Sequence, residues 1–180
     1  MKLYTLLLFS LLLIGCNNTN TNTNNNNSSS TSTSNSGSQY TSKMSKSDKK
    51  KFYDQNDNVV YEVKYKSDAF KLRTASSQLI WKVKLYDDKV KISDNEENLN
   101  PYEIKIMGAQ EAKLTKNDET VARTTYESAT SSQTINFEDA SQSAITKEMS
   151  YSPALLVEAI SEIPKDQQQI IISELTDKGY

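Results

Sequence analysis

Histidine is absent from this chain of 180 residues, and cysteine occurs only once, as Cys16. The region after Cys16 therefore contains no Cys/His zinc site and no disulfide, and it has no Cys–His pair or Ser–His–Asp triad for nucleophilic catalysis. Carboxylate chemistry and Ser–Lys chemistry remain open, but no residue spacing favours either. We therefore expect a domain that is not an enzyme and that needs no metal or other cofactor.

Long apolar runs are also missing, with the exception of residues 3–14, which follow Lys2. A positive charge followed by a short apolar run is typical of a signal peptide, and this run is shorter than the roughly 20 residues that span a bilayer. The Leu13-Ile14-Gly15-Cys16 sequence resembles the lipobox of bacterial lipoproteins. The resemblance implies that residues 1–15 are removed and that Cys16 carries acyl chains. The alternative is an ordinary secretory signal peptide in which Cys16 has no role.

Charge and large apolar side chains are missing from residues 17–39, which are almost entirely Asn, Ser and Thr. Such a composition predicts disorder, because little apolar surface can be buried to offset the entropy of ordering. We interpret residues 16–39 as the lipidated cysteine and a flexible tether with a reach of roughly 25–30 Å. Residues 40–51 form a lead-in rich in Lys and Ser. These features predict a lipid-anchored protein of the cell envelope that faces the periplasm or the cell exterior.

Alternation of apolar and polar residues dominates residues 52–140. It is clearest at residues 59–65 and 79–85, and shorter versions recur along the region. Period-two alternation is typical of half-buried strands, and the intervening Asn, Asp and Ser clusters are typical of turns. Glycine is scarce, so Asn and Asp must supply most positive-φ positions. The predicted fold is of the α+β class: a mainly antiparallel sheet of about seven to nine short strands, arranged as a meander, barrel or sandwich.

A loose internal repeat is present in residues 70–123, where a short strand, a polar turn and a second strand recur with a spacing near 20 residues. This pattern is similar to the tandem hairpins of tubby-like and LURP-one-like barrels. The resemblance implies a binding protein that faces lipid, and no binding residue is transferred from it.

The period changes in residues 141–180, which predict two short helices packed on the same domain. Ser152 and Pro153 are typical of a helix start, and Asp166 follows Pro164 as the cap of a second helix. The first apolar face consists of Leu155, Leu156, Ala159, Ile160 and Ile163. The second consists of Ile170, Ile171, Ile172 and Leu175, with Gly179 near its end. We expect these helices to cover the sheet or to plug one end of a barrel.

Basic residues occupy the polar positions of the predicted strands. They are Lys64, Lys71, Arg73, Lys82, Lys84, Lys89, Lys91 and Lys105, with Lys113 at the end of the row. On neighbouring strands they would form a face for anionic lipid, a cell-wall polymer or an acidic envelope protein. Nucleic acid is not expected, because the aromatic residues lie on the opposite side of the strands. The alternative is a solvated face whose lysines prevent aggregation.

Charge is divided unevenly along the chain. Residues 43–91 carry thirteen basic against seven acidic residues, a balance of +6, and residues 92–180 carry seven against sixteen, a balance of −9. Such a split can mark an interaction face. Residues 94–98 supply oxygen atoms suited to calcium but lack the spacing and the glycine of a calcium loop, so we expect a solvated turn.

The sequence thus predicts a membrane-anchored lipoprotein whose non-catalytic β-rich domain binds or scaffolds a component of the cell envelope. A second hypothesis is a lipid- or hydrophobe-binding barrel, which requires an apolar cavity of several hundred Å³. A third is a small accessory enzyme or inhibitor that uses carboxylates.

Overall fold

The computed structural model describes residues 39–180. Cys16, the predicted signal peptide and nearly all of the predicted tether lie outside the described residues. The described part consists of eleven strands followed by a 3₁₀ helix and an α-helix. The strands are β1 (Thr41–Lys46), β2 (Lys49–Tyr53), β3 (Val59–Lys66), β4 (Ala69–Thr74), β5 (Leu79–Tyr86), β6 (Lys89–Ser93), β7 (Tyr102–Gly108), β8 (Glu111–Lys116), β9 (Glu119–Glu127), β10 (Ser132–Phe137) and β11 (Ile145–Glu148).

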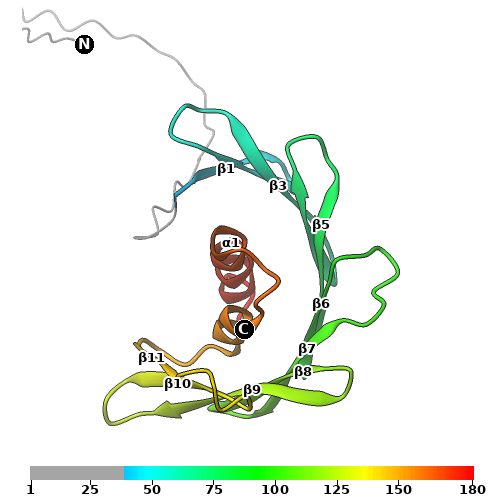
Figure 1. Cartoon of the computed structure of the whole chain (residues 1–180). Helices are drawn as coiled ribbons and strands as arrows, with labels where there is room; N and C mark the ends of the chain where they lie inside the picture. Colours follow the sequence, from blue (N-terminus) through cyan, green and yellow to red (C-terminus); the bar gives the residue numbers. More distant parts are fainter. Residues whose placement is uncertain (1–38) are drawn as a thin grey trace, which may run out of the picture.

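All strands belong to one antiparallel meander, in which each strand pairs with its neighbours in the sequence. The sheet curves strongly and stays open, with β1 and β11 as its two edges (Figure 1). The two helices lie on its concave side (Figure 1). The predicted α+β class and antiparallel sheet are confirmed. Of the predicted arrangements, the structure adopts the meander.

A backbone hydrogen bond recurs along the sheet with the same 20-residue spacing as the internal repeat of the sequence. The β1–β2, β3–β4 and β5–β6 hairpins each have an aspartate in their turn, and its backbone carbonyl accepts a hydrogen bond from an N–H group of the strand that follows the hairpin. The pairs are Tyr65 to Asp48 (2.9 Å), Leu85 to Asp68 (2.8 Å) and Ile106 to Asp88 (2.9 Å). The three aspartates are spaced 20 residues apart. Each hairpin is therefore fixed against the next one in the same way.

Asparagine and aspartate supply most of the left-handed turn positions, as predicted from the scarcity of glycine. Five of the seven non-glycine residues with positive φ are Asn or Asp. Asn117 and Asp118, with φ of 50° and 64°, form the β8–β9 turn as a consecutive pair. Short polar side chains tolerate this conformation because they bond locally to the backbone.

The helices η1 (Pro153–Ala159) and α1 (Lys165–Thr176) fill the concave side of the sheet. The predicted apolar face of the first helical segment is buried completely, and η1 is a 3₁₀ helix. In α1, Ile170, Ile171 and Leu175 are buried, whereas Ile172 is only partly covered. These side chains share one hydrophobic core with the inward residues of the strands, including Val63, Leu72, Val83 and Ile104.

Polar side chains of α1 bind the rim of the same concave face. The Tyr65 hydroxyl donates to Glu174 Oε2 at 2.7 Å, and Lys50 Nζ lies 2.6 Å from Glu174 Oε1. At the other end of the helix, the Tyr61 hydroxyl donates to Asp166 Oδ2 at 2.7 Å. Trp81 Nε1–H donates to Gln167 Oε1 at 2.8 Å. Tyr61, Tyr65 and Trp81 thus pack in the core and also fix the position of the helix.

The structure corrects several details of the prediction. Residues 40–51 are not a lead-in but contain β1 and β2, and β11 lies within the segment expected to be helical, so eleven strands replace seven to nine. The alternation rule misses β2 because its inward Lys50 is charged. That charge is tolerated because Glu174 neutralises it. Ser152 is the N-cap residue of η1 and Pro153 begins that helix, as predicted, although the Ser152 hydroxyl donates to the Tyr180 carbonyl and not to the helix. The second predicted cap is wrong, because Pro164 is the N-cap of α1 and Asp166 lies in its first turn.

Truncating the buried face of α1 should strongly destabilise the domain. Ile171 is fully buried, and Ile-to-Ala changes in a core cost about 2–5 kcal/mol because they remove apolar contacts and leave a cavity. We expect a loss of this size for Ile171→Ala in urea denaturation. Ile172→Ala, on the partly covered side of the same turn, should cost clearly less. Equal losses for the two variants would contradict the assigned helix orientation.

Candidate functional site

The convex face of the sheet carries a row of basic side chains that we name the basic band. Successive side chains of a strand point to opposite faces, and the inward neighbours of these residues are buried in the core. The basic side chains therefore point outward, away from the helices. The band consists of Lys49, Lys64, Lys71, Lys82, Lys84, Lys89, Lys91, Lys105, Lys113 and Arg123.

Like charges lie directly opposite one another along this band. One row crosses β2 to β5 through Lys49, Lys64, Lys71 and Lys82. A second row crosses β6 to β9 through Lys89, Lys105, Lys113 and Arg123. Lys84 on β5 faces Lys91 on β6 and joins the two rows. The register thus contains seven pairs of like charges, and each such pair is unfavourable in a sheet.

The eight residues predicted from the sequence are all brought together on this face. Seven belong to the band, and Arg73 lies beside it on β4, two residues after Lys71. Sequence reasoning missed Lys49 and Arg123. Lys49 was missed because its strand was not predicted, although Asp48-Lys49 occupies the same place in the 20-residue repeat as Asp88-Lys89. Arg123 was missed because it lies within β9, a strand with weak alternation.

Two of the strand carboxylates on this face, Glu62 and Glu103, each contact two lysines. Glu62 Oε2 lies 2.8 Å from Lys49 Nζ, and its Oε1 lies 3.6 Å from Lys51 Nζ. Glu103 lies 2.6 Å from Lys91 Nζ and 3.3 Å from Lys105 Nζ. Partial burial raises the pKa of each carboxyl, but the hydrogen bonds and charges of the lysines outweigh burial, so both pKa values lie below their usual range.

A third carboxylate, Glu96, reaches this face from the β6–β7 loop. It forms ion pairs with Lys71 and with Arg73, the latter at 3.1 Å, while Lys82 donates to its backbone carbonyl. The hydrogen bond from Lys71 is the main reason why the pKa of Glu96 is lowered. The loop over residues 94–98 is thus a turn held against the sheet. No group of three or more potential metal-ligating carboxylates occurs in the described part of the chain.

Half of the basic band is left without a carboxylate partner. Within residues 39–180, no ion pair involves Lys64, Lys82, Lys84, Lys89 or Lys113. Lys84 and Lys89 each lie 5.6 Å from the centroid of the exposed Tyr86 ring, which accommodates cations by a cation–π interaction. These ammonium groups are available to an anionic ligand without the loss of an internal ion pair.

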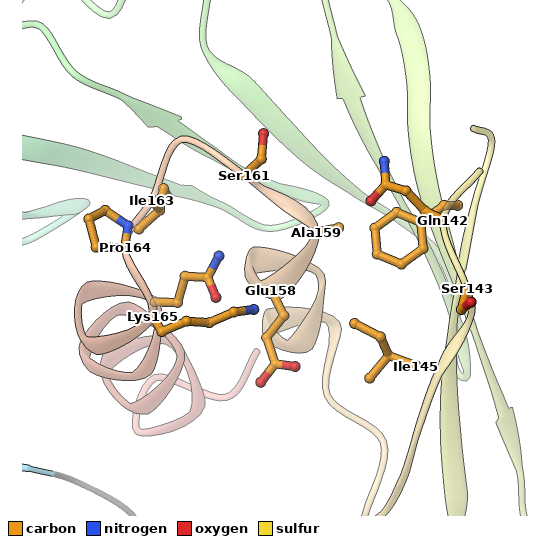
Figure 2. A pocket seen from close by; sticks show the side chains of 11 residues that line it. Gln142, Ser143, Ile145, Glu158, Ala159, Ser161, Ile163, Pro164 and Lys165 are labelled. Atoms are coloured by element: carbon orange, nitrogen blue, oxygen red, sulfur yellow. The ribbon is translucent and has the colours of Figure 1, made fainter. Parts of the chain in front are cut away.

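Two pockets lie near the band or the helices. One of about 510 Å³ lies between the β10–β11 region and the helical segment. Figure 2 shows Lys165 and Glu158 on its helical side, opposite Ser143 and Ile145. Glu158 is paired with Lys147. The second, of about 380 Å³, is lined mainly by polar side chains and includes Glu103 of the convex face.

Comparisons of the chain with protein-family models, with curated proteins and with solved structures find no match. The resemblances to bacterial lipoproteins and to tubby-like barrels therefore stay predictions. None of the helices in residues 39–180 is long and apolar enough to cross a membrane. The geometry of the convex face is the basis for a functional proposal.

Removing a charge from the band should stabilise the free domain. Lys64 faces Lys49 on one side and Lys71 on the other, and each like-charge pair costs about 0.2–1 kcal/mol. We expect Lys64→Gln to raise the free energy of unfolding by about this amount in low-salt urea titrations. The gain should vanish near 1 M salt, where charges are screened within roughly 3 Å. Lys165→Gln, which lies in a helix, is the control. If Lys64→Gln were less stable than the wild type at low salt, the inferred repulsion of Lys64 by Lys49 and Lys71 would be contradicted.

Proposed function

We propose that this chain is a membrane-anchored lipoprotein of the cell envelope whose β-rich domain binds an anionic envelope component through the basic band, without catalysing a reaction. The observation that carries the proposal is the set of seven like-charge pairs across neighbouring strands. A face that serves only for solvation gains stability when lysine and glutamate alternate between strands.

An anionic ligand turns this unfavourable arrangement into a favourable one. Each lysine near an anionic surface contributes about 1 kcal/mol of attraction, which falls off within roughly 8 Å at physiological ionic strength. Five ammonium groups of the band have no ion pair to break in residues 39–180. The band also spans eight consecutive strands, from β2 to β9, so an extended polyanion could contact many of its charges at once.

The filled concave side favours the convex face over an internal binding cavity. A lipid or hydrophobe carrier needs a large apolar space inside the sheet. Here Leu155, Leu156 and Ile171 occupy that space and are almost fully buried. The pocket of about 510 Å³ lies at one edge of it, beside β11, where the charged Glu158 and Lys165 belong to its lining. Because the core fills this internal space, we favour binding on the convex face.

The carboxylates near the second pocket also fit binding better than hydrolysis. Glu103 and Asp118 both line it. A general acid needs a raised pKa, whereas Lys91 and Lys105 help to lower the pKa of Glu103 against the effect of its burial.

Neutralising two lysines at the centre of the band should weaken binding to anionic surfaces. Because each lysine contributes about 1 kcal/mol, the double variant Lys82→Gln/Lys84→Gln should bind vesicles with anionic lipid or a soluble polyanion roughly thirtyfold more weakly. Cosedimentation at low salt measures the change. The control is Lys165→Gln/Lys178→Gln, which changes the net charge equally on the helical segment. Unchanged binding by the first variant would refute the proposal.

The anchor can be tested separately from the band. Cys16→Ser should move the expressed full-length protein from the membrane fraction to the soluble fraction at high salt, because no acyl chain can be attached. Fractionation followed by immunoblotting measures this. A variant that stays with the membrane in high salt would show that lipidation of Cys16 is not the anchor.

A further inference from the structure

A polar pocket of about 380 Å³ opens on the convex face directly beside the basic band. Its lining residues come from the segment before β7, from β7 and β8, and from the turn after β8. They are Asn100, Pro101, Glu103, Thr115, Asn117 and Asp118. Glu103 belongs to both sites, because it faces Lys91 in the register and forms ion pairs with Lys91 and Lys105. The pocket therefore adjoins the band, since the Glu103 carboxylate lies 2.6 Å from Lys91 Nζ and 3.3 Å from Lys105 Nζ.

Three side chains of the pocket are free to bind a ligand. Asn100, Asn117 and Asp118 are exposed, and their side chains make no hydrogen bond within residues 39–180. Their backbones are fixed in the left-handed region, with φ of 45°, 50° and 64°. The Lys116 ammonium donates to the Asn100 carbonyl at 2.6 Å and holds that segment in place. The backbone positions of these three residues are thus set before a ligand arrives, and their exposed side chains can turn toward it.

The chemistry of these groups indicates a ligand rich in hydroxyls. Amides both donate and accept hydrogen bonds, and carboxylates accept them, which matches the donor and acceptor character of sugar hydroxyls. The neighbouring lysines match an oxyanion. We propose that the polar pocket and the adjoining part of the band bind one ligand, a phosphate-bearing glycan, with sugar hydroxyls in the pocket and phosphate against Lys89 and Lys113, which face Lys105 from either side and have no ion pair within residues 39–180. This inference rests on the proposed function and specifies its ligand class.

The shape of the face favours a polymer over a bilayer. The sheet is strongly curved (Figure 1), so a flat membrane touches only the crest of its convex side and cannot enter a hollow. A glycan chain can follow the curvature and place a sugar in the pocket. The band supplies attraction for either ligand, and the pocket distinguishes between them.

Glycine substitutions remove the pocket groups without disturbing the backbone. Glycine adopts positive φ without strain, so Asn100→Gly/Asn117→Gly removes both amides and preserves the turns and the net charge. Ser131→Gly is the matched control, because Ser131 also has positive φ, of 49°, and does not line the pocket. Urea denaturation confirms that each variant is folded, and the two single Asn→Gly variants replace the double variant if it is not.

The probes are phosphorylated dextran, inorganic polyphosphate of matched charge, unmodified dextran, and vesicles with anionic lipid. We expect the wild-type protein to bind phosphorylated dextran more tightly than polyphosphate or vesicles. The double variant should lose about tenfold or more in affinity for phosphorylated dextran, as expected for the loss of two or more hydrogen bonds. Its affinity for polyphosphate should not change, and Ser131→Gly should behave as the wild type.

Two results would overturn the glycan inference without contradicting the proposed binding of anions by the basic band. One is equal binding of phosphorylated dextran by the wild type and the folded pocket variants. The other is tighter binding of vesicles or polyphosphate than of phosphorylated dextran by the wild type. If the proposed function itself is wrong, Lys82→Gln/Lys84→Gln will bind every anionic probe as tightly as the wild type does. That result differs from the two above, so the two failures can be told apart.

Discussion

The packing of η1 and α1 against the concave face of the sheet is the contact on which the rest of the structure depends. An open antiparallel sheet needs one face covered to be stable. Side chains such as Leu156 and Ile171 cover that face from within the curve. The helices thereby fix the curvature of the meander and leave the convex face as its broad exposed surface. We therefore place the proposed binding site on the convex face of the sheet.

Some of the charged residues follow the same division into an inner and an outer face. Acidic residues of the C-terminal part, such as Asp166 and Glu174, turn inward and bind tyrosines and Lys50 at the rim of the concave side. Burial, with the hydrogen bond and charge of Asp166, raises the pKa of Tyr40 to about 12. The basic residues of the strands turn outward. Only part of the uneven charge of the two halves thus becomes a division between the inside and the outside of the domain, because other acidic residues of the C-terminal half, such as Glu111 and Glu127 on the strands, are exposed.

The sequence allows the antiparallel class, the clearest strands and the basic face to be predicted, because alternation is a local signal. Trp81 and Val83 in β5 follow it and are buried. Strand β2 does not follow it, since its inward Lys50 is stabilised by Glu174, which lies 124 residues later. No local pattern reveals such a partner. The polar pocket was missed for a related reason, because its residues meet only when the register of β7, β8 and their flanking turns is known.

Lysine footprinting is the most direct test of the proposal that the convex basic band is the binding face. The folded domain is acetylated with and without bound polyphosphate, and the modification of each lysine is quantified by mass spectrometry. We predict that the ligand protects Lys64, Lys82, Lys84 and Lys89, which are free of ion pairs within residues 39–180. Lys165 and Lys178, on the helical segment, should stay equally reactive. Protection of those two lysines, or equal protection of all lysines, would contradict the proposal.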